Sequence, residues 1–352
     1  MATIREVANK AGTSIGTVSK ALNGSHTISI EKTELIKRIA LELGYKPNAR
    51  AQGFARKSTR QVAFVTRLGR NIAFDNPHMF EILSGAEFAL SQKGYSLTLQ
   101  NCDANEACFF SKDIWNSKGM DGLMIHASVV SRDLALYLES EKVPHIIIGK
   151  PVFKSNLCWI DNDNRLSGEI AAKRLIGLGH ENCVLICSYE NDNISEDRLS
   201  GMKAILGDDR IVKTLRGSST IESGVELGIE LLKDRKLVTA VVCVNNLLAE
   251  GCLRAFKLKN IRVPADISMI TFDEYPFARF TEPPLTTISI DLFELGMQAG
   301  KLLARKIRNP NLHVQSYSTL PVLVERHSDR SLLIETGQTN LGCLLEDVNT
   351  SG

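Results

Sequence analysis

The chain has 352 residues, 43% of them hydrophobic and 23% charged, which is the composition of a soluble globular protein with two or three domains. No apolar run approaches the length of a membrane-spanning helix, and residues 1–10 mix charged with apolar side chains, so neither a membrane span nor a secretory signal is expected. We therefore expect a cytoplasmic protein. The eight cysteines lack the close pairs of a zinc ribbon or a redox motif, so reduced, mostly buried thiols without a metal are expected.

Charge is unevenly distributed along the chain. Residues 1–60 contain eleven Lys or Arg and four Asp or Glu, a net charge of +7, whereas the remaining residues together carry −5. A basic first segment favours contact with a polyanion, although basic termini are also common where they are only solvated.

Three short helices are predicted in this basic segment. Apolar side chains at three- and four-residue spacing predict a helix over Ile4–Ala11. Gly12 ends it, and Ser14 is placed to cap a second helix over 15–23. A third helix is predicted between Ser29 and Gly44. Because a three-residue turn joins the first two helices, they are predicted to form a helix-turn-helix.

The residues of these helices form a long ordered string. It begins Thr3-Ile4-Arg5-Glu6-Val7-Ala8, continues through Thr17-Val18-Ser19-Lys20-Ala21-Leu22-Asn23 and ends in Leu43-Gly44-Tyr45-Lys46-Pro47-Asn48. This string resembles the amino terminus of transcriptional regulators of the LacI/GalR family. The resemblance implies a DNA-binding domain over residues 1–46 whose second helix enters the major groove. The residues that it assigns to DNA within this domain are Thr3, Ser14, Ile15, Gly16, Thr17, Ser19, Lys20 and Asn23.

Three of these positions are expected to face base edges. Ile15 is suited to a thymine methyl group, Lys20 is suited to donate to a guanine acceptor, and Gly16 offers no side chain. The threonines and serines of the set are better interpreted as phosphate contacts or helix caps that fix the register. Some family members have polar residues at both of the first two positions of the second helix, where this chain has Ile15 and Gly16. The operator sequence is therefore left open.

Residues 47–60 are predicted to be a hinge helix and linker. A stretch this short that contains Gly53 should not hold a helix alone in water, so we expect it to order on DNA. In related repressors the hinge helix pairs with its dimer mate in the minor groove and wedges a leucine between bases, and Phe54 stands at that position here. The alternative is a linker residue packed on its own domain. The resemblance also assigns hinge contacts with DNA to Asn48, Arg50 and Ala51.

From residue 61 onward, short β-rich runs alternate with amphipathic helical stretches. Buried strands are predicted in a first set at Val62–Val65, Ser96–Leu99, Gly122–Ile125 and His145–Ile148, and in a second set at Val184–Cys187, Ile211–Val212, Ala240–Val244 and Ser268–Phe272. This rhythm predicts an α/β body of two Rossmann-like lobes over residues 61–330. The predicted lobes are 61–157 with 288–315 and 158–287 with 316–330, followed by a tail, 331–352, without a recognisable motif.

The body also resembles the periplasmic-binding-protein-like effector domain of the same family. Its markers are Asp121-Gly122-Leu123-Met124-Ile125, Asp161-Asn162-Asp163-Asn164, Leu178-Gly179-His180, Val263-Pro264-Ala265-Asp266-Ile267-Ser268 and Pro283-Pro284-Leu285-Thr286-Thr287. Most of these are interpreted as structural, and His180 is interpreted as a hydrogen-bonding residue at a helix end. Ligands of open parallel sheets bind outside the carboxyl ends of the strands, so a cleft between the lobes is the expected binding site.

The resemblance places the effector contacts at a few positions. Arg198 and Asp273 match the family's effector-binding arginine and aspartate, and this pair of side chains suits a polyhydroxyl ligand. Asn245 is expected to add an amide contact, while Asn246 replaces the aspartate often found beside it. In the first lobe, the segment between Val62 and Pro77 is longer than the corresponding segment usual in the family. Its charged residues include Arg67, Arg70 and Asp75. His78 and Met79 stand where aromatic residues commonly face the ligand.

These features predict a homodimeric repressor of carbohydrate-related genes that binds a pseudo-palindromic double-stranded operator and responds to a sugar or sugar derivative, including an acidic or phosphorylated one. The main alternative is a stand-alone sugar-binding protein of the transport type. An enzyme is not expected, and no cofactor is implied, because the chain has no nucleophile elbow, dinucleotide fingerprint or metal-spaced histidines.

Overall fold

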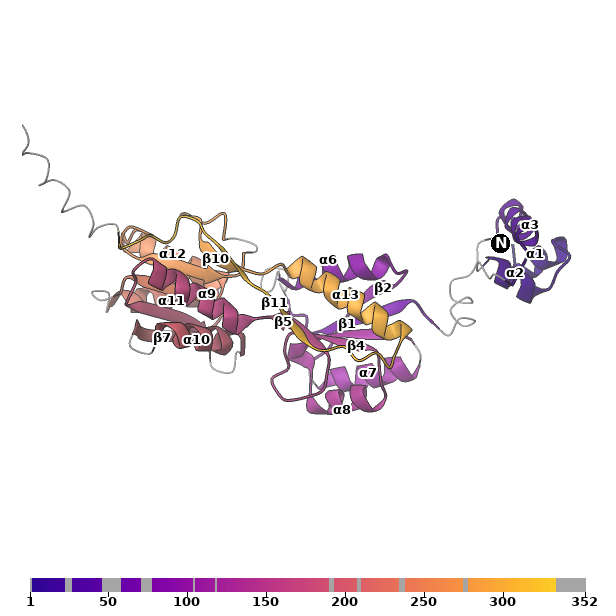
Figure 1. Cartoon of the computed structure of the whole chain (residues 1–352), viewed down its shortest axis with the longest axis horizontal. Helices are drawn as coiled ribbons and strands as arrows, with labels where there is room; N and C mark the ends of the chain where they lie inside the picture. Colours follow the sequence, from indigo (N-terminus) through magenta and orange to yellow (C-terminus); the bar gives the residue numbers. More distant parts are fainter. Residues whose placement is uncertain are drawn as a thin grey trace, which may run out of the picture.

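The computed structural model describes residues 2–22, 27–45, 58–70, 78–103, 105–117, 119–189, 193–207, 210–233, 238–274 and 278–333. They form a three-helix head and two α/β lobes that lie side by side (Figure 1).

The head consists of α1 (Ile4–Lys10), α2 (Ile15–Leu22) and α3 (Ile30–Glu42). Its core is a single cluster to which all three helices contribute, and the fully buried members are Val7, Val18, Ala21 and Ile36. The apolar spacing that predicted the helices therefore corresponds to their inner faces.

The turn between α1 and α2 is the predicted one. Gly12 has a φ of +58°, a conformation that glycine adopts without strain. Ser14 caps α2, because its Oγ accepts a hydrogen bond from the backbone N–H of Thr17 at 3.1 Å. At the start of α1, Thr3 and Glu6 form a reciprocal capping box. The short, capped turn fixes the direction in which α2 leaves α1.

The first lobe contains a sheet in which all six strands are parallel, in the order β11-β5-β4-β3-β1-β2. The strands are β1 (Gln61–Thr66), β2 (Ser96–Asn101), β3 (Gly122–His126), β4 (His145–Ile148), β5 (Trp159–Asn162) and β11 (Tyr317–Thr319). Alternate side chains of the buried strands point to opposite faces, which separates the interior into two apolar clusters.

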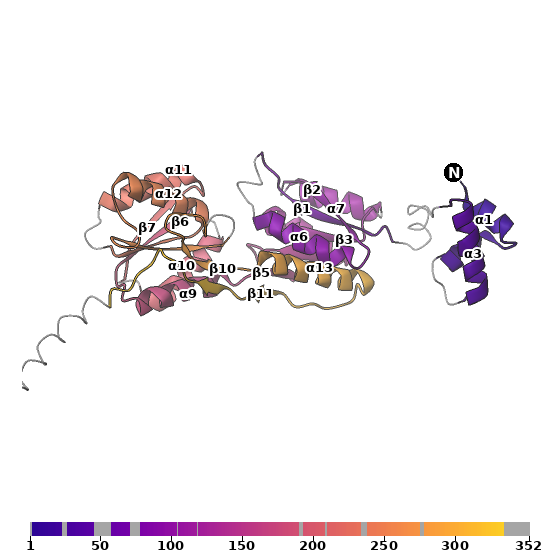
Figure 2. The same ribbon diagram turned by 90° about the horizontal axis from the view of Figure 1, so that it is seen from above.

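Two pairs of helices cover the faces of this sheet. On one face, α6 (His78–Ser91) packs along α13 (Leu292–Arg308), and the two lie side by side in both views (Figures 1 and 2). The other face carries α7 (Glu106–Asn116) and α8 (Arg132–Ser140), and a short 3-10 helix, Ala127–Val129, follows β3. Both faces are thus buried, as the continuous apolar runs predicted.

The second lobe has a six-stranded sheet in the order β12-β10-β9-β8-β6-β7, with only β12 antiparallel to its neighbour. The strands are β6 (Cys183–Ser188), β7 (Ile211–Gly217), β8 (Ala240–Cys243), β9 (Ser268–Phe272), β10 (Thr286–Ser289) and β12 (Val322–Val324). The helices pack as two pairs: α9 (Asn164–Gly177) with α10 (Asn193–Leu206), and α11 (Ile221–Leu231) with α12 (Asn246–Leu258). The eight strands expected from the sequence are all present.

The chain passes between the lobes three times, and all three predicted boundaries are wrong. The boundary predicted at residue 288 falls inside β10, which pairs with β9 in the second sheet up to Ile288, so this crossing follows Ser289. β5 and β11 were assigned to the second lobe, but they pair with each other and β5 pairs with β4 in the first sheet. The other two crossings therefore follow these strands, at residues 163 and 320, and do not precede them at 158 and 316. Local sequence cannot reveal this, because a strand's sheet is decided by its distant pairing partner.

Two glycines allow α9 and α10 to approach closely. A Cβ added at Gly168 would lie 2.0 Å from the backbone oxygen of Arg198, and one at Gly201 would lie 1.9 Å from that of Arg165. Both distances are far below van der Waals contact, so each position requires glycine.

We expect Gly168→Ala to lower the free energy of unfolding by about 1–3 kcal/mol, because α10 must move away from α9. Gly177→Ala is the matched control, since it lies in the same helix with open space at its Cβ position and alanine favours helix. Urea unfolding followed by circular dichroism would measure both variants. Equal stability of the two variants would contradict the close-packing argument.

Candidate functional site

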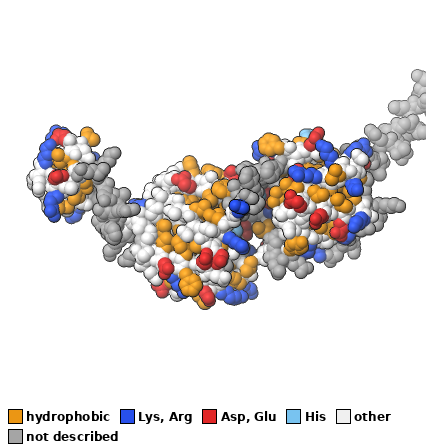
Figure 3. Space-filling view, turned by 180° about the vertical axis from the view of Figure 1, so that it is seen from behind, with side chains coloured by type: hydrophobic (Ala, Val, Ile, Leu, Met, Phe, Trp, Pro, Cys, Tyr) orange, Lys and Arg blue, Asp and Glu red, His pale blue; other side chains and the backbone are white. Residues whose placement is uncertain are grey.

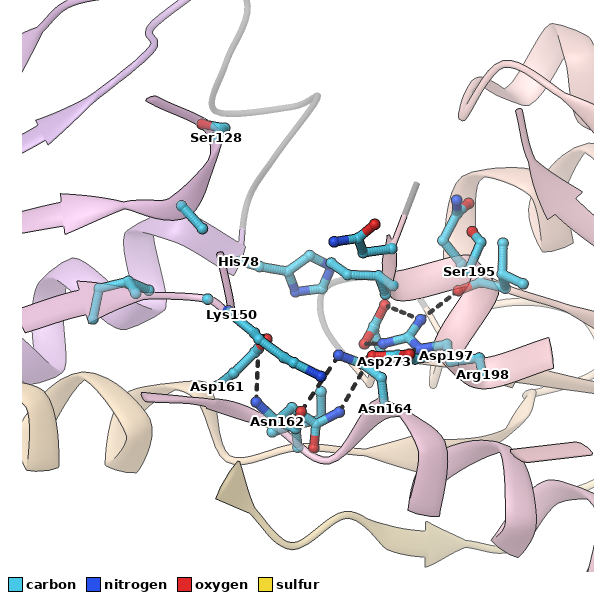
Figure 4. A pocket seen from close by; sticks show the side chains of 18 of the residues that line it. His78, Ser128, Lys150, Asp161, Asn162, Asn164, Ser195, Asp197, Arg198 and Asp273 are labelled. Atoms are coloured by element: carbon cyan, nitrogen blue, oxygen red, sulfur yellow. Dashed lines mark hydrogen bonds and ion pairs between the residues drawn. The ribbon is translucent and has the colours of Figure 1, made fainter. Parts of the chain in front are cut away.

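A cavity of about 730 Å³ lies between the two lobes. Three strands of the first sheet end beside it, at His126, Ile148 and Asn162, and β8 and β9 of the second sheet lead into Val244 and Asp273 on its wall. The cavity thus forms at the carboxyl ends of both parallel sheets, the expected place for a ligand. Figure 4 shows side chains from both lobes converging on it.

Arg198 and Asp273 form an ion pair on the second-lobe side of the cavity. The two nitrogens of the guanidinium end group donate to the two carboxylate oxygens at 3.3 and 3.0 Å. Arg198 lies on α10 and is only 4% exposed, while Asp273 directly follows β9. The residues that the resemblance placed together are therefore in direct contact.

Further contacts immobilise the guanidinium of Arg198. Its Nε donates to Oδ1 of Asn164 at 3.1 Å, and one end nitrogen donates to the backbone oxygen of Val244 at 2.5 Å. The central carbon of the guanidinium, Cζ, also lies 4.5 Å from the ring centroid of Phe272, within the range of a cation–π contact. Arg198 is therefore a fixed cationic group at the floor of the cleft.

Asp273 is held in an uncommon backbone conformation. Its φ is +70°, in the left-handed region that favours glycine, and its backbone N–H donates to the oxygen of Ile288 at 3.0 Å. Burial raises the pKa of Asp273, but the charges of Arg198 and His78 and the hydrogen bond from Arg198 outweigh it, so the pKa lies below its usual value. Asp273 is thus a carboxylate at neutral pH, ready to accept hydrogen bonds.

A second carboxylate, Asp161 on β5, also lines the cavity. It accepts hydrogen bonds from the backbone N–H groups of Lys150 at 2.8 Å and Asn162 at 2.7 Å. Burial nevertheless raises the pKa of Asp161, so the ionised form lacks the solvation that it would have in water. Sequence reasoning quoted this aspartate only as part of a structural marker. No strand was predicted over β5, so no signal in the sequence placed this carboxylate at the carboxyl end of a sheet.

An amide network joins the first crossing between the lobes to Arg198. Asn162 is the last residue of β5 in the first sheet, and Asn164 is the first residue of α9 in the second lobe. Oδ1 of Asn164 accepts from Nδ2 of Asn162 at 3.2 Å and from Nε of Arg198 at 3.1 Å. The last residue of a first-lobe strand is therefore connected to the cleft arginine through one asparagine side chain.

The first lobe faces this floor with histidine, methionine and lysine side chains. Figure 4 shows His78 and Lys150 reaching into the cleft towards Asp273 and Arg198. His126 has a fixed tautomer, because its Nδ1 accepts from the backbone N–H of Ser128 at 3.3 Å and the ring proton is therefore on Nε2. Burial lowers the pKa of His126, which keeps the ring neutral as a donor beside the cavity.

The structure brings all five residues of the predicted effector set to the cavity wall: His78, Met79, Arg198, Asn245 and Asp273. Their contact with an effector stays a prediction. The Asn245 side chain already caps α12, accepting from the N–H of Leu248 at 3.0 Å and donating to Ser219 Oγ at 3.0 Å. Arg67 and Arg70 do not line the cavity, and Asp75 lies outside the described residues.

The helix-turn-helix presents part of the predicted DNA set on an outer face. Ile15, Gly16 and Lys20 are exposed on α2, with 42% of the Ile15 surface accessible, although an isoleucine is usually buried. Thr17 and Ser19 are half-buried beside them, and the capping roles considered for Thr3 and Ser14 are confirmed. The other predicted contacts, Asn23, Asn48, Arg50, Ala51 and Phe54, lie outside the described residues.

Other sites considered from the sequence have structural explanations. The ring of His180 is hydrogen-bonded at both nitrogens, to Thr239 Oγ1 and to the backbone oxygen of Arg330, as expected for a structural residue.

Seven of the eight cysteines are described, and all seven are buried free thiols. Among the described residues, no cluster of three or more His, Cys, Asp or Glu is arranged to hold a metal ion. Within the same ranges, none of the helices has the length and apolar character needed to cross a bilayer.

Comparison with known proteins is consistent with this architecture. Residues 3–48 match the family described as bacterial regulatory proteins, lacI family, and residues 172–328 match a periplasmic binding protein-like domain. The transcriptional repressor PurR of Haemophilus influenzae (strain PittEE) is 30% identical over 95% of this chain and 100% of its own length. The ribose operon repressor of Haemophilus influenzae (strain ATCC 51907) is 29% identical over 94% of this chain and 100% of its own.

Solved structures show the same arrangement. That of the transcriptional regulator CelR in complex with cellobiose is 27% identical and superimposes with a TM-score of 0.68, covering 93% of this chain and 100% of CelR. The match thus extends over the head and both lobes. With its helix-turn-helix, its two-lobed body and an end-to-end relative at 30% identity, this chain belongs to the lacI family of bacterial regulatory proteins.

Proposed function

We propose that this protein is a homodimeric transcriptional repressor whose affinity for operator DNA is controlled by a neutral sugar or sugar derivative bound between its lobes. One observation carries the proposal: an ordered arginine–aspartate pair faces a large cleft in a chain that also has a helix-turn-helix. Relatives named as the ribose operon repressor and the CelR–cellobiose complex support a carbohydrate ligand.

The chemistry of the cleft favours hydroxyl groups. Asp161 approaches from the first lobe and Asp273 from the second, so a ligand between them donates to a carboxylate on each side. His126 and Lys150 supply donors to ring and hydroxyl oxygens. Because each lobe contributes part of the binding surface, the ligand binds the closed arrangement more tightly than the open one and shifts the equilibrium towards it.

The charges of the cleft favour a neutral ligand over a sugar acid or sugar phosphate. Among the described lining residues, Asp161, Glu196, Asp197 and Asp273 outnumber the cations Lys150 and Arg198. Arg198 is paired with Asp273, and Glu196 is paired with Arg216 at 2.7 Å. Of the lining residues that the structure describes, this leaves the carboxylates of Asp161 and Asp197 and the ammonium of Lys150 outside any ion pair, so the excess of negative charge remains. An additional anion would therefore be repelled.

The head and linker are suited to a polyanion. Residues 46–60 contain five Lys or Arg and no Asp or Glu, so much of the positive charge of the first segment lies next to the helix-turn-helix. Lys and Arg side chains are also spread over the visible face of the head (Figure 3). A dimer would present two such heads to a pseudo-palindromic site, which is the reason for proposing a homodimer. Binding to DNA also implies a cytoplasmic location.

We also propose that the cleft has no catalytic activity. The nearest approach to a nucleophile and base is Ser128 Oγ with His126 Nδ1 at 2.7 Å. The same Nδ1 accepts from the backbone N–H of Ser128, which makes the contact a local turn cap. The sequence alternative, a stand-alone transport protein, does not account for the helix-turn-helix.

Two measurements test the function as a whole. Genomic fragments retained by the purified protein should include specific sites, with an affinity that falls steeply as salt rises, and sedimentation should show a dimer. A thermal-shift panel of neutral sugars, sugar acids and sugar phosphates, including ribose and cellobiose, should give its largest rise with a neutral sugar. A monomer that retains all fragments equally would contradict the regulator, and a preference for phosphorylated sugars would contradict the charge argument.

We expect Lys20→Ala to reduce discrimination between the preferred DNA site and its variants by about 1–3 kcal/mol, the scale of one base contact. The matched control is Lys37→Ala, because this lysine lies on α3, 3.3 Å from Glu34. Competition binding with single-base variants of a retained fragment measures both. An unchanged order of preference in the Lys20 variant would rule out base reading by this residue.

We expect Asp273→Asn to weaken binding of the panel sugar at least tenfold while DNA binding without sugar persists. The substitution keeps the shape of the side chain but removes the acceptor charge beside Arg198. Calorimetric titration would measure the sugar affinity, and Asp133→Asn on the exposed face of α8 is the control. Because a buried arginine without its partner destabilises the fold, urea unfolding should accompany the titration. Unchanged sugar affinity in a folded variant would refute the assignment of this residue.

A further inference from the structure

The residues that connect the linker to the body are clamped by one carboxylate. Asp121 accepts four hydrogen bonds from three consecutive residues: from the Ser58 hydroxyl at 2.5 Å, the Thr59 backbone N–H at 2.7 Å, the Thr59 hydroxyl at 3.0 Å and the Arg60 backbone N–H at 3.0 Å. Bonds to an ionised acceptor are stronger than those between neutral groups. The segment next to the body is therefore held at all three residues.

The backbone and side chain of Arg60 add to this clamp. Its φ is +56°, an uncommon conformation for a residue with a side chain, and its backbone oxygen accepts from the N–H of Ser96 at 2.9 Å. The guanidinium lies 5.1 Å from the ring centroid of Tyr95. The uncommon conformation persists because its surroundings hold it, and such positions are concentrated at functional sites.

Asp121 is connected to the cleft by one strand. It directly precedes β3, which ends at His126 on the cavity wall. This strand is paired on both sides, with β1 and with β4, so it is an interior strand held by the whole sheet. One end of β3 thus holds the segment that leads to the head, and the other end borders the effector cleft.

We propose that Asp121 is the positioning residue that couples the effector cleft to the DNA-binding head. It touches neither DNA nor effector. It fixes Ser58, Thr59 and Arg60 to the first lobe, so that a rotation of that lobe on ligand binding moves the start of the linker with it. The role rests on the proposed effector-controlled DNA binding. It differs from a purely stabilising one, because the loss of the clamp should uncouple two binding events and leave each intact.

The first test needs no ligand. In the full chain, Asp121→Ala should speed hydrogen exchange of the Thr59 and Arg60 amides at least tenfold, because both amides donate to this carboxylate. Exchange of the amides in β4 should remain unchanged. Asp133→Asn, on the exposed surface of the same lobe, is the control and should change neither. Unaltered exchange at Thr59 and Arg60 would show that Asp121 does not hold the segment and would overturn the proposal.

The second test measures coupling. The probes are the genomic fragment retained most tightly by the wild-type protein and the panel sugar with the largest thermal shift. Asp121→Ala and the milder Asp121→Asn should keep the thermal shift, while the ratio of DNA affinities without and with sugar falls towards one. A ratio equal to that of the wild type would overturn the coupling role alone. If the wild type itself shows no sugar-dependent DNA binding, the proposed function fails, and the coupling role fails with it.

Discussion

The buried pair of Arg198 and Asp273 is the interaction on which the second lobe's side of the cleft depends. Moving two ionised groups out of water costs more free energy than their attraction provides, unless their geometry is good and the remaining donors are hydrogen-bonded. Here the guanidinium also donates to Asn164 and to the oxygen of Val244, and it lies over the ring of Phe272. The guanidinium of Arg198 thereby connects the ends of β8 and β9 with the starts of α9 and α10.

The close packing of α9 against α10 follows from the same requirement. The arginine must reach the end of β9 from its own helix, and glycines at positions 168 and 201 bring the two helix backbones together at that point. The asparagines at residues 162 and 164 then connect this packed unit to the first lobe. The second-lobe side of the cleft is consequently tied together by close packing and hydrogen bonds, and short crossings join it to the first lobe.

Three chain crossings join the lobes, one after each of β5, β10 and β11. Each crossing is only a few residues long, an arrangement that suits rotation of two rigid lobes about a hinge. A ligand that contacts both lobes would favour the arrangement that it binds more tightly, by its difference in affinity for the two. The first lobe also holds residues 58–60 through Asp121, and the proposed coupling of sugar and DNA binding depends on this connection.

The sequence by itself determined the helix-turn-helix, the eight strands that it predicted, the family and the two side chains that form the central ion pair. These depend on local periodicity, on capping residues such as Ser14 and on ordered motifs, all of which are readable along the chain. Tertiary structure alone decided that β5 and β11 belong to the first sheet, that Asp161, His126 and Lys150 join the cleft, and that Asp121 holds residues 58–60. Each of these depends on partners tens or hundreds of residues away, and the free energy of such contacts leaves no local pattern in the sequence.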